Sequence, residues 1–489
     1  DCEPPLYLYR RHGLDFPQHL RGMYAIAIHD QAKDLLVLSR DPFGIKQLYY
    51  AETPRGFAFA SEPQAIVGAG LVTPRVNAAK RGEILQIQYS TGDDTIFEGI
   101  KRLAPGETIA VKAGRVVERR RIAALPQGAP VAIGEAEALE RLDAVLEDTV
   151  KVHQRSDVPY AMFLSGGLDS TAVLAMMARL NPRPVVAYTA YFPGTSVHDE
   201  RDYARAAVAK TGAEHIEVPF DEADFWALLP AVAAAMDEPA SDYATLPTYK
   251  LAAEAKKRFK VVLSGEGGDE LLAGYGRYRM MTRPWWFLRR LIRRGTFTSL
   301  GVLRQIPEGW RSGLEAEERA AAQPGRGKLQ VAQAADCAHW LPNDLLIKLD
   351  RCLMANQLEG RTPFLDPEMA KFAFLLPDDL KLRDDRGKYL LRRWVDQRVP
   401  EVKPFAPKRG FTVPVVEWIA QRGAELGDLV ARQPAIEEIA IPGAVRAMFA
   451  NPVGRRGFGC WSLLFYALWY RRHIEGKRPE GGVFDVLRA

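Results

Sequence analysis

The stretch Ser165-Gly166-Gly167-Leu168-Asp169-Ser170 joins a predicted strand to a predicted helix. The apolar run 159–164 before it is typical of a buried strand, and residues 171–177 after it are typical of a helix. A glycine-rich turn at a helix N-terminus suits a phosphate group, because free backbone N–H groups point at the anion. Asp169 would repel that phosphate unless a cation lay between them, so the turn predicts Mg²⁺ as well as a nucleotide. The structural alternative is a tight capped turn, which needs neither both glycines nor both serines.

A second glycine-framed turn is Ser264-Gly265-Glu266-Gly267-Gly268-Asp269-Glu270, which follows the apolar run 260–264. Its three carboxylates would repel one another without a cation or a cationic substrate nearby. An acidic surface turn is the alternative, but such turns seldom follow a buried strand directly. We therefore expect this second turn to face the same ligand as the first.

Predicted strands and helices alternate through the middle of the chain. Strands are expected at 159–164, 185–191, 215–218 and 260–264, with helices opening at 198 and spanning 221–235. Alternation of this kind predicts a parallel sheet covered on both faces. Ligands of such sheets bind beyond the carboxyl ends of the strands, where both turns lie. Beyond about residue 276 the pattern is mainly helical.

Residues 1–120 are predicted to be all-β. The strands expected there are 23–30, 35–41, 48–51, 56–60, 83–89 and 107–111. Residues 121–133 are rich in proline, glycine and alanine and are predicted to be a linker. The remaining segment, 134–489, would form a second domain, which begins with an amphipathic helix.

Composition limits the possible functions. A chain of 489 residues predicts two or three domains, and a net charge of +5 is too weak to indicate nucleic-acid binding. The four cysteines have neither zinc-site spacing nor a disulfide framework, which favours a reducing, cytoplasmic setting. We find no signal peptide and no apolar run long enough for a membrane span.

The first turn resembles the pyrophosphate loop of the ATP pyrophosphatases, which cleave ATP between the α- and β-phosphates and adenylate a carboxyl or carbonyl oxygen. Alone it leaves open GMP, NAD, argininosuccinate and asparagine synthetases and tRNA-modifying enzymes. The second turn resembles the Ser-Gly-Glu-Gly-x-Asp-Glu motif of asparagine and β-lactam synthetases. These resemblances imply that Asp169 and Asp269 hold Mg²⁺, and that Glu266 assists acyl-adenylate formation or takes a proton from the attacking amine. They imply ATP contacts at Leu164, Ser165, Gly166, Gly167, Asp169, Ser170, Ala190, Ser264 and Gly265.

Three further segments resemble the same family. Residues 350–366 match a signature in which a helix enters a proline turn, where either an ion-pair corner or a substrate-facing role is open. Residues 407–414 match a C-terminal loop, which implies that Lys408 closes over the phosphates as pyrophosphate leaves. Residues 237–242 resemble a segment near the adenylation site, without assigned roles.

The N-terminal segments 1–3, 20–25, 40–46 and 60–62 resemble the glutaminase domain of asparagine synthetase-type amidotransferases. The resemblance implies that Asp1 holds the amino-acid head of glutamine. The N-terminal nucleophilic cysteine of that domain, its Asn-Gly-Glu loop and its arginine are not found here. We therefore expect a truncated glutaminase domain, and we interpret Cys2 as a packed thiol rather than a nucleophile.

Together these features predict an α/β protein. A truncated Ntn-type glutaminase β-sheet domain would precede a doubly wound parallel-sheet ATP pyrophosphatase domain with a helical C-terminal part. The predicted activity is an ATP- and Mg²⁺-dependent ligase that adenylates aspartate and transfers ammonia from glutamine, giving amide, AMP and pyrophosphate. The alternatives are another carboxylate acceptor (a peptide, a polysaccharide or a β-amino acid) and an inactive nucleotide-binding scaffold. A homodimer is possible, and the basic, apolar stretch 285–294 is interpreted as a covered helix or partner surface rather than a membrane contact.

Overall fold

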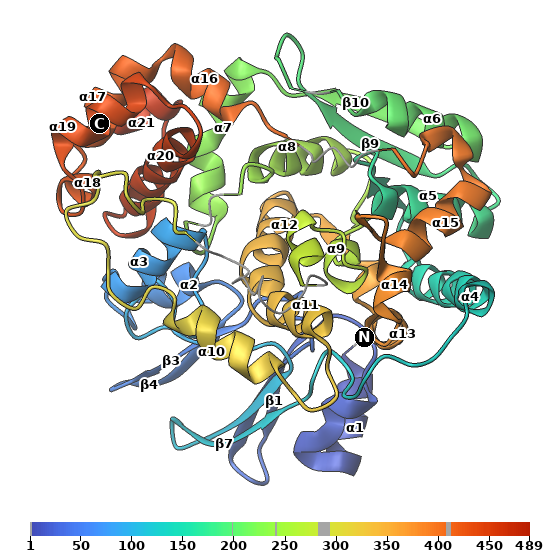
Figure 1. The fold of residues 1–489 in the computed structure, drawn as a ribbon. Coiled ribbons are helices and arrows are strands. Elements are labelled where there is room, and N and C mark those ends of the chain that lie inside the picture. The colour runs from blue at the N-terminus through green and yellow to red at the C-terminus, as the bar shows by residue number, and fades with distance from the viewer. Residues whose placement is uncertain (1, 198, 240–241, 282–293, 407–411) are drawn as a thin grey trace.

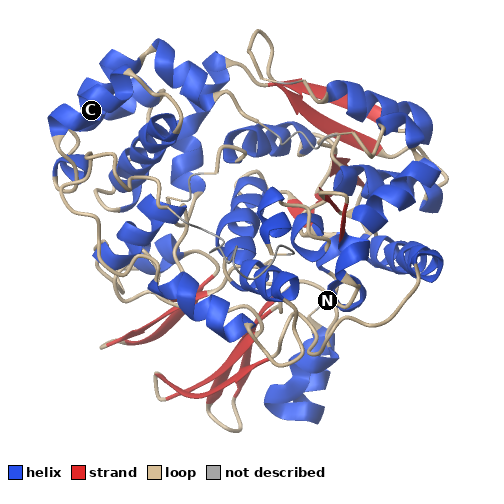
Figure 2. Cartoon of the chain, in the orientation of Figure 1, coloured by secondary structure: helices blue, strands red, loops and turns tan. Residues whose placement is uncertain are grey.

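The computed structural model describes the chain except for residues 1, 198, 240–241, 282–293 and 407–411. Its strands fall into two groups, and helices make up most of the rest (Figure 2). The N-terminal strands lie at the bottom of Figure 1, the second group lies at the upper right, and the last helices lie at the upper left. Each helix in the described part of the chain is either too short or too polar to span a lipid bilayer.

A five-stranded parallel sheet forms the centre of the larger part. Its order is β10-β9-β8-β11-β12, and the predicted parallel pairing is confirmed. The strands are β8 Tyr160–Phe163, β9 Val186–Tyr191, β10 Glu214–Pro219, β11 Val261–Leu263 and β12 Glu359–Arg361. From β8 the sheet grows through β9 and β10 on one side and through β11 and β12 on the other, so the strand order reverses at β8. Such a switch point opens a crevice for ligands.

Alternate side chains of these strands enter two separate cores, as the two-residue period of a strand requires. Ala161 and Val262 pack with helices α7 Glu222–Ala235 and α8 Thr245–Ala255. Met162 and Leu263 pack with helices α4 Glu135–His153 and α5 Leu168–Leu180. The sheet is therefore covered on both faces, as expected. Helix α6 Arg201–Thr211 lies beside α5.

The N-terminal part carries two antiparallel sheets, ordered β1-β2-β6-β7 and β4-β3-β5. Their strands are β1 Ala25–Asp30, β2 Leu35–Arg40, β3 Tyr49–Thr53, β4 Gly56–Ala60, β5 Lys101–Arg102, β6 Glu107–Lys112 and β7 Arg115–Arg121. Five of the six predicted strands are confirmed. The all-β prediction is wrong, because α1 Glu3–His12, η1 Gly13–His19, α2 Pro63–Gly68 and α3 Ala78–Ile87 are helical.

The predicted strand 83–89 is the clearest error, since most of it lies in helix α3. The Asn77 side chain caps this helix by accepting hydrogen bonds from the backbone N–H groups of Ala79 and Lys80. Residues 82–87 are all buried, so the helix has no polar face to reveal its period. Cys2 is exposed, so the packed-thiol interpretation is also wrong.

Residues 122–134 contain neither helix nor strand, and α4 follows them. After the parallel sheet the chain is mainly helical, as predicted. These helices are α9 Gly268–Leu271, η2 Gly276–Met280, α10 Ser312–Ala321, α11 Lys328–Ala338, η4 Leu341–Leu345, α12 Leu346–Met354, η5 Pro363–Leu365, α13 Pro367–Phe374, α14 Asp378–Lys381, α15 Tyr389–Arg398, η6 Pro400–Val402, α16 Val415–Gln421, α17 Gly423–Ala431, α18 Pro434–Glu437, α19 Pro442–Ala450, α20 Arg455–His473 and α21 Val483–Arg488. A short hairpin, β13 Leu382–Arg383 and β14 Arg386–Gly387, precedes α15.

A buried ion pair joins the N-terminal sheets to the larger part. The Arg102 guanidinium donates to Glu238 at 2.6 Å, and both side chains are at most 4% exposed. Glu238 also accepts from the Ser90 hydroxyl at 2.7 Å and from the Ile96 N–H at 2.8 Å. A buried carboxylate with this many donors is well satisfied, and its loss would leave Arg102 buried without a counter-charge.

The segment 350–366 contributes a second set of contacts to the same junction. Lys46 donates to Asp350 at 3.0 Å, Arg21 donates to Asp366 at 2.9 Å, and Arg351 donates to the Ser61 carbonyl. These contacts favour the ion-pair corner over the substrate-facing role for this signature. Arg351 also donates to Asp237, to which the Tyr49 hydroxyl donates at 2.9 Å.

We predict that Glu238→Ala lowers the free energy of unfolding by about 3–5 kcal/mol, because it strands a buried arginine. Urea unfolding followed by circular dichroism measures this change. Glu137→Ala is the control, since Glu137 is 64% exposed on α4 and forms only a loose pair at 3.9 Å with Arg141. Equal unfolding midpoints for the two variants would contradict the prediction.

Candidate active site

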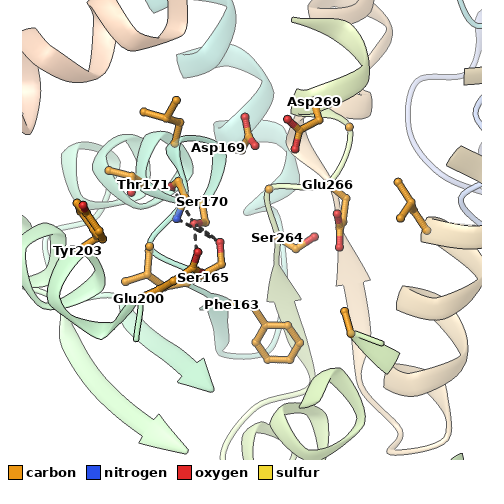
Figure 3. A pocket seen from close by; sticks show the side chains of 18 of the residues that line it. Phe163, Ser165, Asp169, Ser170, Thr171, Glu200, Tyr203, Ser264, Glu266 and Asp269 are labelled. Carbon is orange, nitrogen blue, oxygen red and sulfur yellow. Dashed lines mark hydrogen bonds between the residues drawn. The ribbon is translucent and has the colours of Figure 1, made fainter. Parts of the chain in front are cut away.

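The first turn begins where β8 ends and closes through its own hydroxyl groups. The Ser170 hydroxyl lies 3.1 Å from the Ser165 hydroxyl, donates to the Gly167 carbonyl and accepts from the Ser165 N–H (Figure 3). Gly166 has a φ of +74°, and a Cβ there would lie 2.8 Å from the Glu200 carbonyl. The turn therefore requires glycine both for its conformation and for its contact with the start of α6.

The second turn begins where β11 ends and packs directly on the first. Met162 of β8 and Leu263 of β11 are paired in the sheet, so both turns emerge from the same edge. A Cβ on Gly265 would lie 2.8 Å from the Ser170 nitrogen, and one on Gly268 would lie 2.3 Å from an Asp169 carboxylate oxygen. Glycine thus permits the two turns to touch, which brings Asp169 and Asp269 together (Figure 3).

Lys388 lies between these two carboxylates. Its ammonium donates to Asp169 and lies 2.7 Å from an Asp269 oxygen, and its side chain is 3% exposed. Burial alone would lower the pKa of Lys388, but the carboxylates of Asp169 and Asp269 outweigh it and raise the pKa above the usual lysine value. The two turns therefore already share one cation.

Lys388 is not among the site residues that the sequence predicts. Two local features mark the position: Lys388 itself has a left-handed backbone with a φ of +58°, and Gly387 precedes it. A Cβ on Gly387 would lie 2.1 Å from the Ala273 carbonyl, so this glycine lets the lysine approach the second turn. An Arg-Gly-Lys before an amphipathic helix is a weak signal without a structure, because lysines at helix starts are usually solvated.

A cavity of about 460 Å³ opens over the two turns. Every residue predicted to contact ATP lines it: Leu164, Ser165, Gly166, Gly167, Asp169, Ser170, Ala190, Ser264 and Gly265. Glu266, Asp269, Lys348 and Lys388 line it as well. This volume lies within the range of small-molecule pockets, roughly 300–1,000 Å³.

Two buried hydroxyls in the cavity wall are available to a ligand. Ser264 is 5% exposed and Thr171 is 1% exposed, and neither side-chain oxygen has a hydrogen-bond partner within the described part of the chain. Buried polar groups are nearly always paired, so such orphan groups at a cavity indicate a polar ligand. Ser264 directly follows β11 and opens the second turn, and Thr171 lies in α5 directly after the first turn.

Two further carboxyl groups of the second turn, Glu266 and Glu270, line the cavity. Burial raises the pKa of Glu266 above its usual value, against the field of the Lys348 ammonium. Burial also raises the pKa of Glu270 to about 8, and Lys348 itself is held by Asp242 at 2.8 Å. A carboxyl with a raised pKa beside a reacting centre is suited to proton transfer.

The donor set of the two turns suits Mg²⁺. Two hard carboxylates converge on one cation position, and Mg²⁺ typically takes one or two carboxylates and fills its other positions with water and phosphate oxygens. Among the residues the structure describes, no group of three or more His, Cys, Asp or Glu side chains could hold a metal. An all-protein metal cage is therefore not found in the described ranges, whereas a site completed by phosphates fits.

Some predicted site residues lie outside the described residues: Lys408, Asp1 and nearly all of the stretch 285–294. Their predicted roles stay predictions.

Comparison with known proteins defines the class of this chain. Residues 141–471 match the family model described as asparagine synthase, and residues 1–121 match the glutamine amidotransferase domain. A putative glutamine-hydrolysing asparagine synthetase of Mycobacterium tuberculosis is 33% identical over 531 residues, covering 97% of this chain and 80% of the relative. Glutamine-hydrolysing asparagine synthetase 1 of Bacillus subtilis is 27% identical (98% and 82%), and amidase chyE of Penicillium rubens is 26% identical (86% and 73%).

These matches are those of a glutamine-dependent ligase that forms carbon–nitrogen bonds. The chain belongs to the asparagine synthase family, which uses ATP. The predicted fold class and enzyme class are therefore confirmed.

We predict that Gly274→Ala lowers ligase activity by about 100-fold without unfolding the protein. A Cβ there would lie 1.8 Å from an Asp269 oxygen and 2.2 Å from the Lys388 Cε, so these flexible side chains must move. Steady-state activity and thermal unfolding are measured together. The control is Gly443→Ala in α19, where a Cβ meets nothing within 4 Å. Full activity in Gly274→Ala would contradict this placement of the two side chains.

Proposed function

We propose that this protein is an asparagine synthetase that adenylates the side-chain carboxylate of aspartate and transfers ammonia to it, releasing AMP and pyrophosphate. The observation that carries the proposal is the convergence of Asp169, Asp269 and Lys388 beneath a cavity lined by both glycine turns. The family membership and the identities of 27–33% to asparagine synthetases support the same activity.

The turn 165–170 would bind the phosphates of ATP through backbone N–H groups and the two serine hydroxyls. Asp169 and Asp269 would hold Mg²⁺, which neutralises phosphate charge when bound. Lys388, displaced from its two carboxylates, would donate to the phosphate oxygens and stabilise the charge that develops as pyrophosphate leaves. Lys408 would add a second cation from its own loop.

Glu266 belongs to the second turn, which follows β11, and it lines the cavity near Ser264 (Figure 3). The pKa of its carboxyl is raised by burial, so it is suited to take a proton from the attacking amine. Ammonia would then displace AMP from the acyl-adenylate and form the amide. Glutamine would supply the ammonia, with Asp1 at the glutamine site. A cytoplasmic location and a homodimer stay predictions.

The test is pyrophosphate release with Mg²⁺, ATP and ammonium chloride across a panel of carboxylic acids. Ammonium chloride supplies ammonia directly, so the assay measures the ligase reaction without requiring glutamine hydrolysis. We expect release with aspartate and formation of asparagine. If pyrophosphate is released with a peptide, a polysaccharide acid or a β-amino acid but not with aspartate, that acid is the acceptor instead. Release with no acid from a folded sample would contradict the proposal.

Lys388→Met is the matched variant in that assay. The substitution removes the Lys388 ammonium expected at the leaving pyrophosphate, so the rate of pyrophosphate release should fall by about 10²–10³-fold. Lys371→Met, at an exposed position of α13, should keep the full rate because Lys371 does not line the cavity.

A further inference from the structure

Helix α9 is a single turn that carries Asp269 and Glu270, and its carbonyl groups need donors. Two are satisfied from the backbone: Leu272 donates to Gly268, and Gly274 donates to Asp269. The carbonyls of Glu270 and Leu271 have no such donor within the turn. A helix this short has little stability of its own, so its position depends on outside contacts.

The side chain of Gln333 supplies the missing donors. Its amide nitrogen lies 2.7 Å from the Glu270 carbonyl and 2.8 Å from the Leu271 carbonyl. Gln333 is on α11 and is fully buried. One side chain therefore caps the end of the turn that bears the acidic residues.

The side chain of Lys381 fixes the orientation of that amide. Its ammonium lies 3.1 Å from the Gln333 amide oxygen and 2.7 Å from the Phe374 carbonyl. An ammonium has only donors, so it faces the oxygen of the amide and leaves the nitrogen toward α9. Lys381 thus reaches the acidic turn through Gln333.

A hairpin connects Lys381 to Lys388. Strands β13 and β14 lie between the two lysines. The Lys388 N–H donates to the Leu272 carbonyl at 2.9 Å, and its ammonium holds Asp269. Both ends of the hairpin are therefore tied to the same turn, one through Gln333 and the other directly.

Burial of Lys381 has a cost that its contacts do not offset. The side chain is fully buried and forms no ion pair with any residue in the described part of the chain. Burial lowers the pKa of Lys381 to about 7, with Asp378 and Cys337 opposing the shift. The polar contacts of this buried ammonium are its hydrogen bonds to Gln333 and Phe374, so its effect on the fold passes through them.

We propose that Gln333 and Lys381 are positioning residues that hold helix α9 and the Lys388 hairpin in register, and so set the cation site between Asp169 and Asp269. The inference rests on the proposed function only in taking ATP with Mg²⁺ as the ligand of that site. Neither residue lines the cavity.

The test compares Gln333→Met and Lys381→Met with the unmodified chain by calorimetric titration with adenosine and with Mg²⁺–ATP. We expect the dissociation constant for Mg²⁺–ATP to rise about 10-fold or more and that for adenosine to stay unchanged. Pyrophosphate release should fall by a similar factor or more. In Lys381→Met the melting temperature should change little, because removing a buried ammonium offsets the loss of its hydrogen bonds to Gln333 and Phe374.

Gln330→Met is the matched control. Gln330 lies one turn earlier on α11, is equally buried and also donates to the Phe374 carbonyl, at 3.2 Å, but none of its hydrogen bonds reaches α9. A general loss of packing would affect this variant as well. Gln333→Glu is the second variant, since its carboxylate would pair with Lys381 yet repel the two carbonyls of α9.

Unchanged Mg²⁺–ATP affinity in both Gln333 variants would overturn the proposal. It would also be overturned if adenosine and Mg²⁺–ATP affinities fell together, in proportion to the melting temperature and equally in Gln330→Met. A chain that binds Mg²⁺–ATP but releases no pyrophosphate with any acid would contradict the proposed function alone, because the two dissociation constants would still test the positioning role.

Discussion

The ammonium of Lys388, buried between the carboxylates of Asp169 and Asp269, is the interaction on which the site depends. Two carboxylates this close would repel each other in a buried cavity wall, so a cation must lie between them. In the structure described here that cation is a lysine. In the proposed reaction the two carboxylates would hold Mg²⁺ when ATP is bound, and the lysine would turn to the phosphates. A single position would then serve both cation binding and charge stabilisation.

Close packing of glycine makes that convergence possible. The two turns leave neighbouring parallel strands, and a side chain at Gly265 or Gly274 would separate the groups that must meet. The helical part then supports the turn from behind through Gln333 and Lys381. The ion pairs of Glu238 and Asp350 act elsewhere, at the junction with the N-terminal sheets. Ligand chemistry and assembly of the two parts therefore use different charged residues.

The parallel sheet and both turns could be predicted from the sequence, because short apolar strands and glycine-framed turns are local patterns. Lys388 could not be, since its partners are distant in sequence and only the folded sheet brings them together. Helix α3 is not apparent from the sequence, because its residues 82–87 are all buried and show no helical period. The role of Asp350 and Asp366 does not follow from the sequence, because a charge pattern alone does not distinguish a domain contact from a substrate contact.

A crystal structure with Mg²⁺ and a non-hydrolysable ATP analogue tests the central claim most directly. We predict one Mg²⁺ ion about 2.1 Å from an oxygen of Asp169 and an oxygen of Asp269, with the Lys388 ammonium moved onto the phosphates. A nucleotide bound with the two carboxylates still closed on Lys388, and its metal held elsewhere, would contradict it.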